Sequence, residues 1–130
     1  MSKIAITMGD PSGIGPEISL KTLANYNKYK NDCLIYGSKD ILEYYKDILN
    51  IEEEINYIKS TDDFIEGKIN VLNIESDQKI KIGKVDPYSG RQAYEYIKAA
   101  ISDALERKVS AVVTCPINKE ALNKGGIHYQ

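Results

Sequence analysis

Residues 4–17, which read IAITMGDPSGIGPE, decide the fold of this chain. The first of them alternate isoleucine with small side chains, which is typical of a short buried strand and predicts one over 3–7. A loop with three glycines and two prolines follows. Pro16 suits the first turn of a helix, where its missing N–H group costs nothing, and apolar residues continue from there at helical spacing. The stretch therefore predicts a strand, a glycine-rich loop and a helix in succession.

Strands and helices continue to alternate along the rest of the chain. The further predicted strands lie at 33–36, 55–58, 69–74 and 110–114. The last of these is apolar throughout, as expected of a strand buried on both faces of a parallel sheet. Three further helices are predicted: one directly after Ser38, one over the periodic segment 93–105, and one near 119–123. We expect Ser38 to cap the helix that follows it. The alternating segment 79–85 predicts an edge strand or an extended arm.

This order of elements predicts an α/β fold. Strands that alternate with helices imply right-handed crossovers, a mostly parallel sheet, and helices on both faces in three layers. Ligands of such sheets bind beyond the carboxyl ends of the strands. Two loops occupy that position here, at 8–17 and at 114–119.

Composition limits the classes of function. The 130 residues suit one domain of ordinary size, and 42% of them are hydrophobic, which is close to the globular norm. With 17 basic and 19 acidic side chains the net charge is −2, which argues against nucleic-acid binding. No apolar run is long enough to span a membrane. Cys33 and Cys115 lie in apolar strand-like settings, which indicates reduced thiols and a cytoplasmic location.

The glycine-rich loop has two interpretations. Gly9, Gly13 and Gly15 form the pattern G-x-x-x-G-x-G, which matches neither the dinucleotide fingerprint nor the phosphate-binding loop. Backbone N–H groups at the following helix N-terminus would attract an anion. The carboxylate of Asp10 would repel phosphate unless it faces a hydroxyl, a cation or a backbone N–H. The alternative is a structural turn in which Asp10 caps the helix or ties the loop.

The segment after the last predicted strand is the second candidate site. It places the hydroxyl of Thr114 at the strand end and Lys119 near a helix start, where the ammonium group would meet a phosphate or carboxylate. The alternative is that Lys119 is a solvated surface lysine.

His128 is the only histidine and forms no metal site by itself. Cys115 has no histidine to act as its base and is interpreted as a structural cysteine.

Three segments in the same order and spacing carry a resemblance to a known family. They read ITMGDPSGIGPE at 6–17, SGRQAYEYIKAA at 89–100 and AVVTCPINKEAL at 111–122. Together they are similar to the 4-hydroxythreonine-4-phosphate dehydrogenase family. The resemblance implies a fold like that of isocitrate and isopropylmalate dehydrogenases, with two α/β domains, an active site in the cleft between them, and a homodimer. Because members of that family are much longer, residues 1–130 are expected to be the N-terminal α/β portion, with the remainder absent from this chain.

The resemblance also implies an oxidoreductase of pyridoxal phosphate (vitamin B6) synthesis. Such an enzyme uses NAD or NADP to oxidise the phosphorylated substrate 4-phosphohydroxy-L-threonine, and decarboxylation then gives 3-amino-2-oxopropyl phosphate. A divalent metal (Zn, Mg or Co) polarises the alcohol oxygen. The metal ligands are expected outside this chain, so it carries no predicted catalytic or metal-binding residue and is expected to be inactive alone. The residues predicted to line the substrate and cofactor cleft are Asp10, Gly13, Gly15, Thr114 and Lys119.

Two alternatives remain open at this point. One is a related enzyme that acts on 4-phospho-D-threonate or 4-phospho-D-erythronate, whose motifs are similar. The other is a non-catalytic α/β domain that binds an anionic metabolite at the glycine-rich loop. If later segments complete the sheet in a longer protein, this part alone should expose an unpaired strand edge or an apolar patch.

Overall fold

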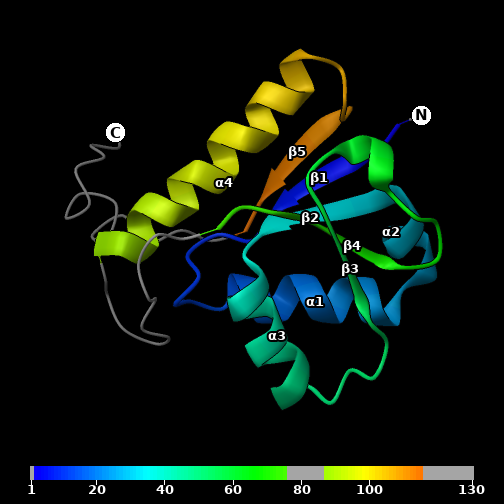
Figure 1. The fold of residues 1–130 in the computed structure, drawn as a ribbon, viewed down its shortest axis with the longest axis vertical. Helices are drawn as coiled ribbons and strands as arrows, with labels where there is room; N and C mark the ends of the chain where they lie inside the picture. Colours follow the sequence, from blue (N-terminus) through cyan, green and yellow to red (C-terminus); the bar gives the residue numbers. More distant parts are fainter. Residues whose placement is uncertain (1, 76–86, 116–130) are drawn as a thin grey trace.

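The predicted first strand is one of five parallel strands in the computed structural model, which describes residues 2–75 and 87–115 (Figure 1). The predicted arm at 79–85 and the predicted short helix at 119–123 lie outside the described residues. The elements in chain order are β1 (Ile4–Thr7), α1 (Gly15–Asn25), α2 (Asn27–Asp32), β2 (Cys33–Gly37), α3 (Lys39–Ile48), β3 (Ile55–Ile58), the 3-10 helix η1 (Thr61–Asp63), β4 (Ile69–Asn73), α4 (Pro87–Leu105) and β5 (Ala111–Thr114).

The strand order is β3-β4-β2-β1-β5, and every neighbouring pair is parallel. The chain moves toward one edge of the sheet from β1 to β2 and β3, and toward the other edge from β4 to β5. Right-handed crossovers therefore put α1 and α3 on one face and α4 on the other. Figure 1 shows this arrangement, with the sheet between α4 and the pair α1 and α3. The predicted three-layer α/β fold is confirmed.

Strand β2 is the centre of the core, because all five of its residues are buried. Layers of helix on both faces explain its continuous apolar sequence. The hydroxyl of Tyr36 on β2 donates a 2.6 Å hydrogen bond to Asp103 on α4, which ties the sheet to that helix. The helices contribute to the same core the buried side chains of Leu20, Leu23, Leu42, Tyr96 and Ala100.

Strand β5 is far more exposed than its sequence predicts. Ala111, Val113 and Thr114 are exposed and Val112 is half-buried, so the expectation of a strand buried on both faces is wrong. Within the described residues β5 lies at the sheet edge, where β1 is its one neighbour. Helix α4 packs against it from one face. The edge position explains the exposure.

Two local features also differ from expectation. Ser38 occupies the N-cap position of α3, but its hydroxyl makes no capping bond and donates instead to the carbonyl oxygen of Ile74 at 2.6 Å. The short helix α2 has the sequence NKYKND, which carries no apolar periodicity and was not predicted.

Within the described residues, none of the helices combines the length and apolarity needed to cross a membrane.

Candidate functional site

The glycine-rich loop after β1 is closed by its own hydrogen bonds. Asp10 is buried, and its Oδ1 accepts hydrogen bonds from the backbone N–H of Ser12 at 2.9 Å and from its hydroxyl at 2.7 Å. The N–H of Gly13 donates to the carbonyl oxygen of Asp10 at 2.9 Å. Gly9 takes a φ of 76°, a conformation that favours glycine. The carboxylate therefore ties the loop, as the structural interpretation expects, and faces a backbone N–H and a hydroxyl.

Gly15 lets the start of α1 approach the ends of two strands. A Cβ atom at Gly15 would lie 1.9 Å from the carbonyl oxygen of Met8 and 3.0 Å from the Cβ of Cys115. At Gly13 the nearest atom to such a Cβ, the carbonyl oxygen of Asp10, would be 3.4 Å away, in ordinary contact. The close approach at Gly15 places the N-terminus of α1, which carries partial positive charge, at the carboxyl edge of the sheet.

Strand β5 brings Thr114 to the same edge. Thr114 is in register with Thr7 on β1, and the N–H of Cys115 donates to the carbonyl oxygen of Thr7 at 3.0 Å. Burial raises the pKa of the Cys115 thiol, which agrees with its interpretation as a structural cysteine rather than a reactive one. Lys119 and His128 lie outside the described residues. The structure thus brings four of the five predicted cleft residues to two neighbouring strand ends.

A buried network of hydrogen bonds joins the carboxyl ends of β2 and β4 to α4. The hydroxyl of Ser38 donates to Ile74 and lies 2.5 Å from the hydroxyl of Tyr96 on α4. The amide nitrogen of Gln92 donates to the same carbonyl oxygen of Ile74 at 2.9 Å. Burial raises the pKa of Tyr96, although its hydrogen bonds with Ser38 and Gln92 oppose the rise. This network is not predicted from the sequence, although Ser38 directly follows a parallel strand, which is the signal that singled out the other two loops.

Two buried hydroxyls at this end of the molecule lack hydrogen-bond partners. They are Thr7 Oγ1 at the end of β1 and Ser89 Oγ in the first turn of α4, and both residues are fully buried within the described part of the chain. An unpaired buried hydroxyl costs free energy unless a water or a ligand group satisfies it. These two oxygens are therefore polar positions at which the edge could contact a small molecule.

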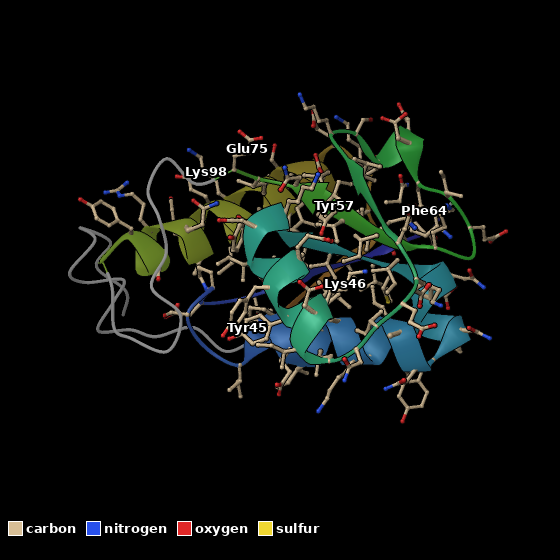
Figure 2. The ribbon with its side chains drawn as sticks, turned by 60° about the horizontal axis from the view of Figure 1, so that its bottom comes forward. Tyr45, Lys46, Tyr57, Phe64, Glu75 and Lys98 are labelled. Carbon is tan, nitrogen blue, oxygen red and sulfur yellow. The ribbon has the colours of Figure 1, made fainter. Side chains whose placement is uncertain are left out.

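A cavity of about 390 Å³ opens beside α3, and its lining is mostly acidic. It is lined by Lys39, Asp40, Glu43, Asn73 and Glu75. Tyr57 on β3 donates a 2.5 Å hydrogen bond to Glu43, and its ring lies 5.2 Å from the ammonium group of Lys39. Figure 2 shows Tyr57 close to α3, and Tyr45 of α3 turned toward the glycine-rich loop, whose Gly13 carbonyl it contacts at 3.4 Å. Among the described residues that line it, three carboxylates face one ammonium group, a balance that does not favour a phosphate.

The described residues offer no ligand set for a metal. Over 2–75 and 87–115, no group of three histidine, cysteine, aspartate or glutamate side chains is close enough to hold an ion. The Oδ1 atom of Asp10 accepts both hydrogen bonds from Ser12.

The chain is similar to known proteins over nearly its whole length. A family profile described as "Pyridoxal phosphate biosynthetic protein PdxA" matches residues 29–130. A Fusobacterium nucleatum protein named "Putative D-threonate 4-phosphate dehydrogenase" is 38% identical, and the match covers 98% of this chain and 40% of that protein. The 4-hydroxythreonine-4-phosphate dehydrogenase of a Sulfurihydrogenibium species is 37% identical, with 99% of this chain and 40% of the relative covered.

Solved structures show the same fold. A crystal structure of a 4-hydroxythreonine-4-phosphate dehydrogenase from Burkholderia phymatum superposes with a TM-score of 0.90 and 33% identity, over 99% of this chain and 40% of that one. A dehydrogenase of Klebsiella pneumoniae with the same name gives 0.87 and 34% identity, over 99% and 41% of the two chains. The chain thus spans about 40% of the length of the relatives it matches.

Proposed function

The chain belongs to the PdxA family of pyridoxal phosphate biosynthetic proteins, and from this premise we propose that it is the N-terminal α/β portion of a dehydrogenase acting on 4-phosphohydroxy-L-threonine. The observation that carries the proposal is the match to 4-hydroxythreonine-4-phosphate dehydrogenases over nearly the whole chain, in sequence and in fold. The reaction removes a hydride from the carbon of a secondary alcohol and a proton from its oxygen, and the β-keto acid formed then loses CO₂.

In this proposal the carboxyl edge of the sheet forms one wall of the active-site cleft. Gly15 sets the position of the α1 N-terminus, and the Asp10–Ser12 hydrogen bonds hold the loop beside it. Thr114 presents its hydroxyl from the neighbouring strand end, with Lys119 next along the chain. The backbone N–H groups and the helix dipole at this edge would favour the anionic groups of a substrate or cofactor.

The proposed reaction requires a nicotinamide cofactor, NAD or NADP, as hydride acceptor. The loop lacks the glycine spacing of a dinucleotide fingerprint, so we assign it no pyrophosphate contact and give it a part in shaping the cleft. The described residues do not fit a divalent metal, because no three suitable side chains converge among them. We therefore place the metal ligands in polypeptide beyond the described part of this chain and route no step through a metal here.

A second substrate class is favoured by a specific observation. The Fusobacterium protein, named for D-threonate 4-phosphate, is as similar to this chain as the Sulfurihydrogenibium protein, named for 4-hydroxythreonine-4-phosphate. Both substrates are phosphorylated secondary alcohols that carry a carboxylate. The second candidate is therefore a dehydrogenase of D-threonate 4-phosphate built on the same edge.

The test replaces the matched N-terminal part of each of these two relatives with residues 1–130 of this chain. We expect NAD(P)H formation by the hybrids and none by the 130-residue chain alone. In each hybrid the ratio of kcat/KM for the two substrates is compared with that of its parent: a shift toward 4-phosphohydroxy-L-threonine in both hosts supports the first substrate, and a shift toward D-threonate 4-phosphate in both supports the second. Folded hybrids that turn over neither substrate would contradict the proposal.

The contribution of the loop is tested within the active hybrid. Asp10→Ala removes both hydrogen bonds to Ser12, so we expect kcat/KM to fall by about tenfold or more because the loop loses its tie. Asp62→Ala is the matched control, since Asp62 is exposed in η1 and takes no part in the edge. If the two variants are equally active, Asp10 makes no contribution to the proposed cleft.

A further inference from the structure

The buried hydroxyl of Ser89 is a polar group at this edge to which the proposed function gives no role. Its Oγ atom is fully buried and has no hydrogen-bond partner among the residues that the structure describes. We propose that the first turn of α4, with this hydroxyl, is a subsite for an oxyanion, either the carboxylate or the phosphate of the substrate. The inference rests on the proposed function in taking a phosphorylated carboxylic acid as the ligand.

Helix α4 brings Ser89 to the carboxyl edge of the sheet. The helix follows β4 and precedes the parallel strand β5, so it starts beyond the strand ends and returns across the sheet. Gln92 in this helix donates to the carbonyl oxygen of Ile74, the residue directly after β4. Ser89 precedes Gln92 by almost one turn and so lies farther out, where Figure 1 shows the start of α4 beyond the strands. Ligands of parallel sheets bind at this edge.

The side chain of Ser89 points inward, toward the space between the helix and the sheet. It shares one face of α4 with Ala93, Tyr96 and Ala100, which follow at helical spacing, and all four residues are fully buried. This face covers the sheet, because α4 packs on β1, β2 and β5. Tyr88, on the other side of the same turn, is 50% exposed, so the turn itself lies at the protein surface.

The charge of this turn favours an anionic ligand. The N-terminus of a helix carries partial positive charge and binds anions through its backbone N–H groups. Residues 87–91 contain no acidic side chain, and Arg91 adds a positive charge to the turn. A hydroxyl that donates to an oxyanion forms a charge-assisted hydrogen bond, which is stronger than a bond to a neutral acceptor. The hydroxyl of Ser89 is therefore a specific donor for a carboxylate or a phosphate.

The missing partner of Ser89 gives the subsite a signature in stability. A buried hydroxyl without a partner destabilises the folded state, so its removal loses no hydrogen bond of the free protein. A group that opposes folding at a ligand-binding edge is typical of a site in which stability is given up for function. Ser89→Ala should consequently leave the unliganded chain as stable as the parent, or more stable, while it weakens binding of the oxyanion. A serine with a purely structural hydrogen bond would show the opposite pair of effects.

The experiment measures binding to the Fusobacterium hybrid without cofactor, so that no turnover occurs. The probes are D-threonate 4-phosphate, D-threonate, which lacks the phosphate, and inorganic phosphate, which lacks the carboxylate. We expect Ser89→Ala to raise the dissociation constant of D-threonate 4-phosphate by about tenfold or more. Ser102→Ala, the same change at an exposed position of α4, should leave that constant unchanged. A loss that recurs with D-threonate identifies the carboxylate as the bound group, and a loss that recurs with inorganic phosphate identifies the phosphate.

Each result decides the proposal. Equal dissociation constants for Ser89→Ala and Ser102→Ala would overturn it, and a lower urea midpoint of Ser89→Ala in that case would show that a water alone satisfies the hydroxyl. A hybrid that turns over neither substrate, yet binds D-threonate 4-phosphate through Ser89, contradicts the proposed function and supports the subsite. An active hybrid whose affinity does not depend on Ser89 refutes the subsite alone.

Two substitutes keep the test decisive where a protein does not fold. Ser89→Cys keeps nearly the volume of the side chain but replaces a strong donor with a weak one, so it should weaken binding as Ser89→Ala does. If the hybrid does not fold, the same variants are compared in the 130-residue chain by the rise in urea midpoint that inorganic phosphate or D-threonate produces. A rise that Ser89→Ala abolishes supports the subsite, and a rise that is absent or independent of Ser89 overturns it.

Discussion

Replacing Gly15 with alanine tests whether the close approach of α1 to the strand ends shapes this edge. The added Cβ would lie 1.9 Å from the backbone carbonyl oxygen of Met8, whereas carbon and oxygen in contact are normally about 3.3 Å apart or more. Backbone must therefore move by more than about 1 Å, and the Cβ of Cys115, only 3.0 Å from the added atom, leaves little room for that movement.

The expected loss in the free energy of unfolding follows from the cost of packing an extra methyl group against backbone atoms. Inserting a group into a packed site costs about 1–3 kcal/mol, and a clash with main chain belongs at the upper end. Alanine recovers about 0.4–1 kcal/mol by restricting the unfolded chain, so the net loss in the free energy of unfolding should be about 2 kcal/mol or more. Gly13→Ala is the matched control, because its Cβ would meet nothing closer than 3.4 Å. That variant should be as stable as the parent chain or slightly more stable.

Urea unfolding provides the measurement. The chain has ten tyrosines and no tryptophan, so circular dichroism and tyrosine fluorescence are the suitable probes. With a slope of about 1.5 kcal/mol per molar urea, Gly15→Ala should lower the midpoint by more than about 1 M relative to Gly13→Ala. If the two variants unfold at the same urea concentration, the approach of α1 is not constrained by Gly15, and the reasoning about the edge fails.

Two further predictions concern tyrosines whose hydroxyls donate hydrogen bonds to carboxylates. Tyr36→Phe removes a 2.6 Å hydrogen bond to Asp103 and should lower the free energy of unfolding by about 1–2 kcal/mol, whereas Tyr94→Phe on the exposed side of α4 should change it little; equal urea midpoints would refute this. Burial raises the pKa of Tyr36 and Tyr57 above 10, and the hydrogen bonds to Asp103 and Glu43 add to the rise. The folded state therefore keeps protons that the unfolded state loses, so stability should be intact below pH 10 and fall as pH rises above it. Urea midpoints measured at pH 8, 10 and 11 check this, and a constant midpoint would contradict it.

The local order of elements could be predicted because it depends on short-range patterns. Alternation in 4–7, the glycine-rich turn and Pro16 each act within a few residues, and together they place β1, the loop and α1 correctly. The role of Ser38 could not be predicted in the same way. Capping is a local rule, but the hydroxyl of Ser38 has its partners at Ile74, directly after β4, and at Tyr96 on α4, and only the folded chain brings these side by side.

The low burial of β5 shows what the sequence of a strand does not predict. Its apolar sequence correctly indicates a strand, yet how much of a strand is covered depends on neighbours that the strand itself does not encode. The same limit applies to the candidate site. Position after a parallel strand identified the loops of Asp10 and Thr114, but that Asp10 would bond inward to Ser12 depends on the path of the loop backbone.

Strand β1 pairs with one strand that follows soon after it and with another that comes much later in the chain. Ile4 is in register with Cys33 on β2 and with Ala111 on β5. Closing the longer of these two chain segments costs about 1 kcal/mol more in chain entropy than closing the shorter one. During synthesis, β2 leaves the ribosome long before β5 does, so the pairing of β1 with β2 becomes possible first. Helix α4 contacts β1, β2 and β5, so it joins the early pairing to the late one.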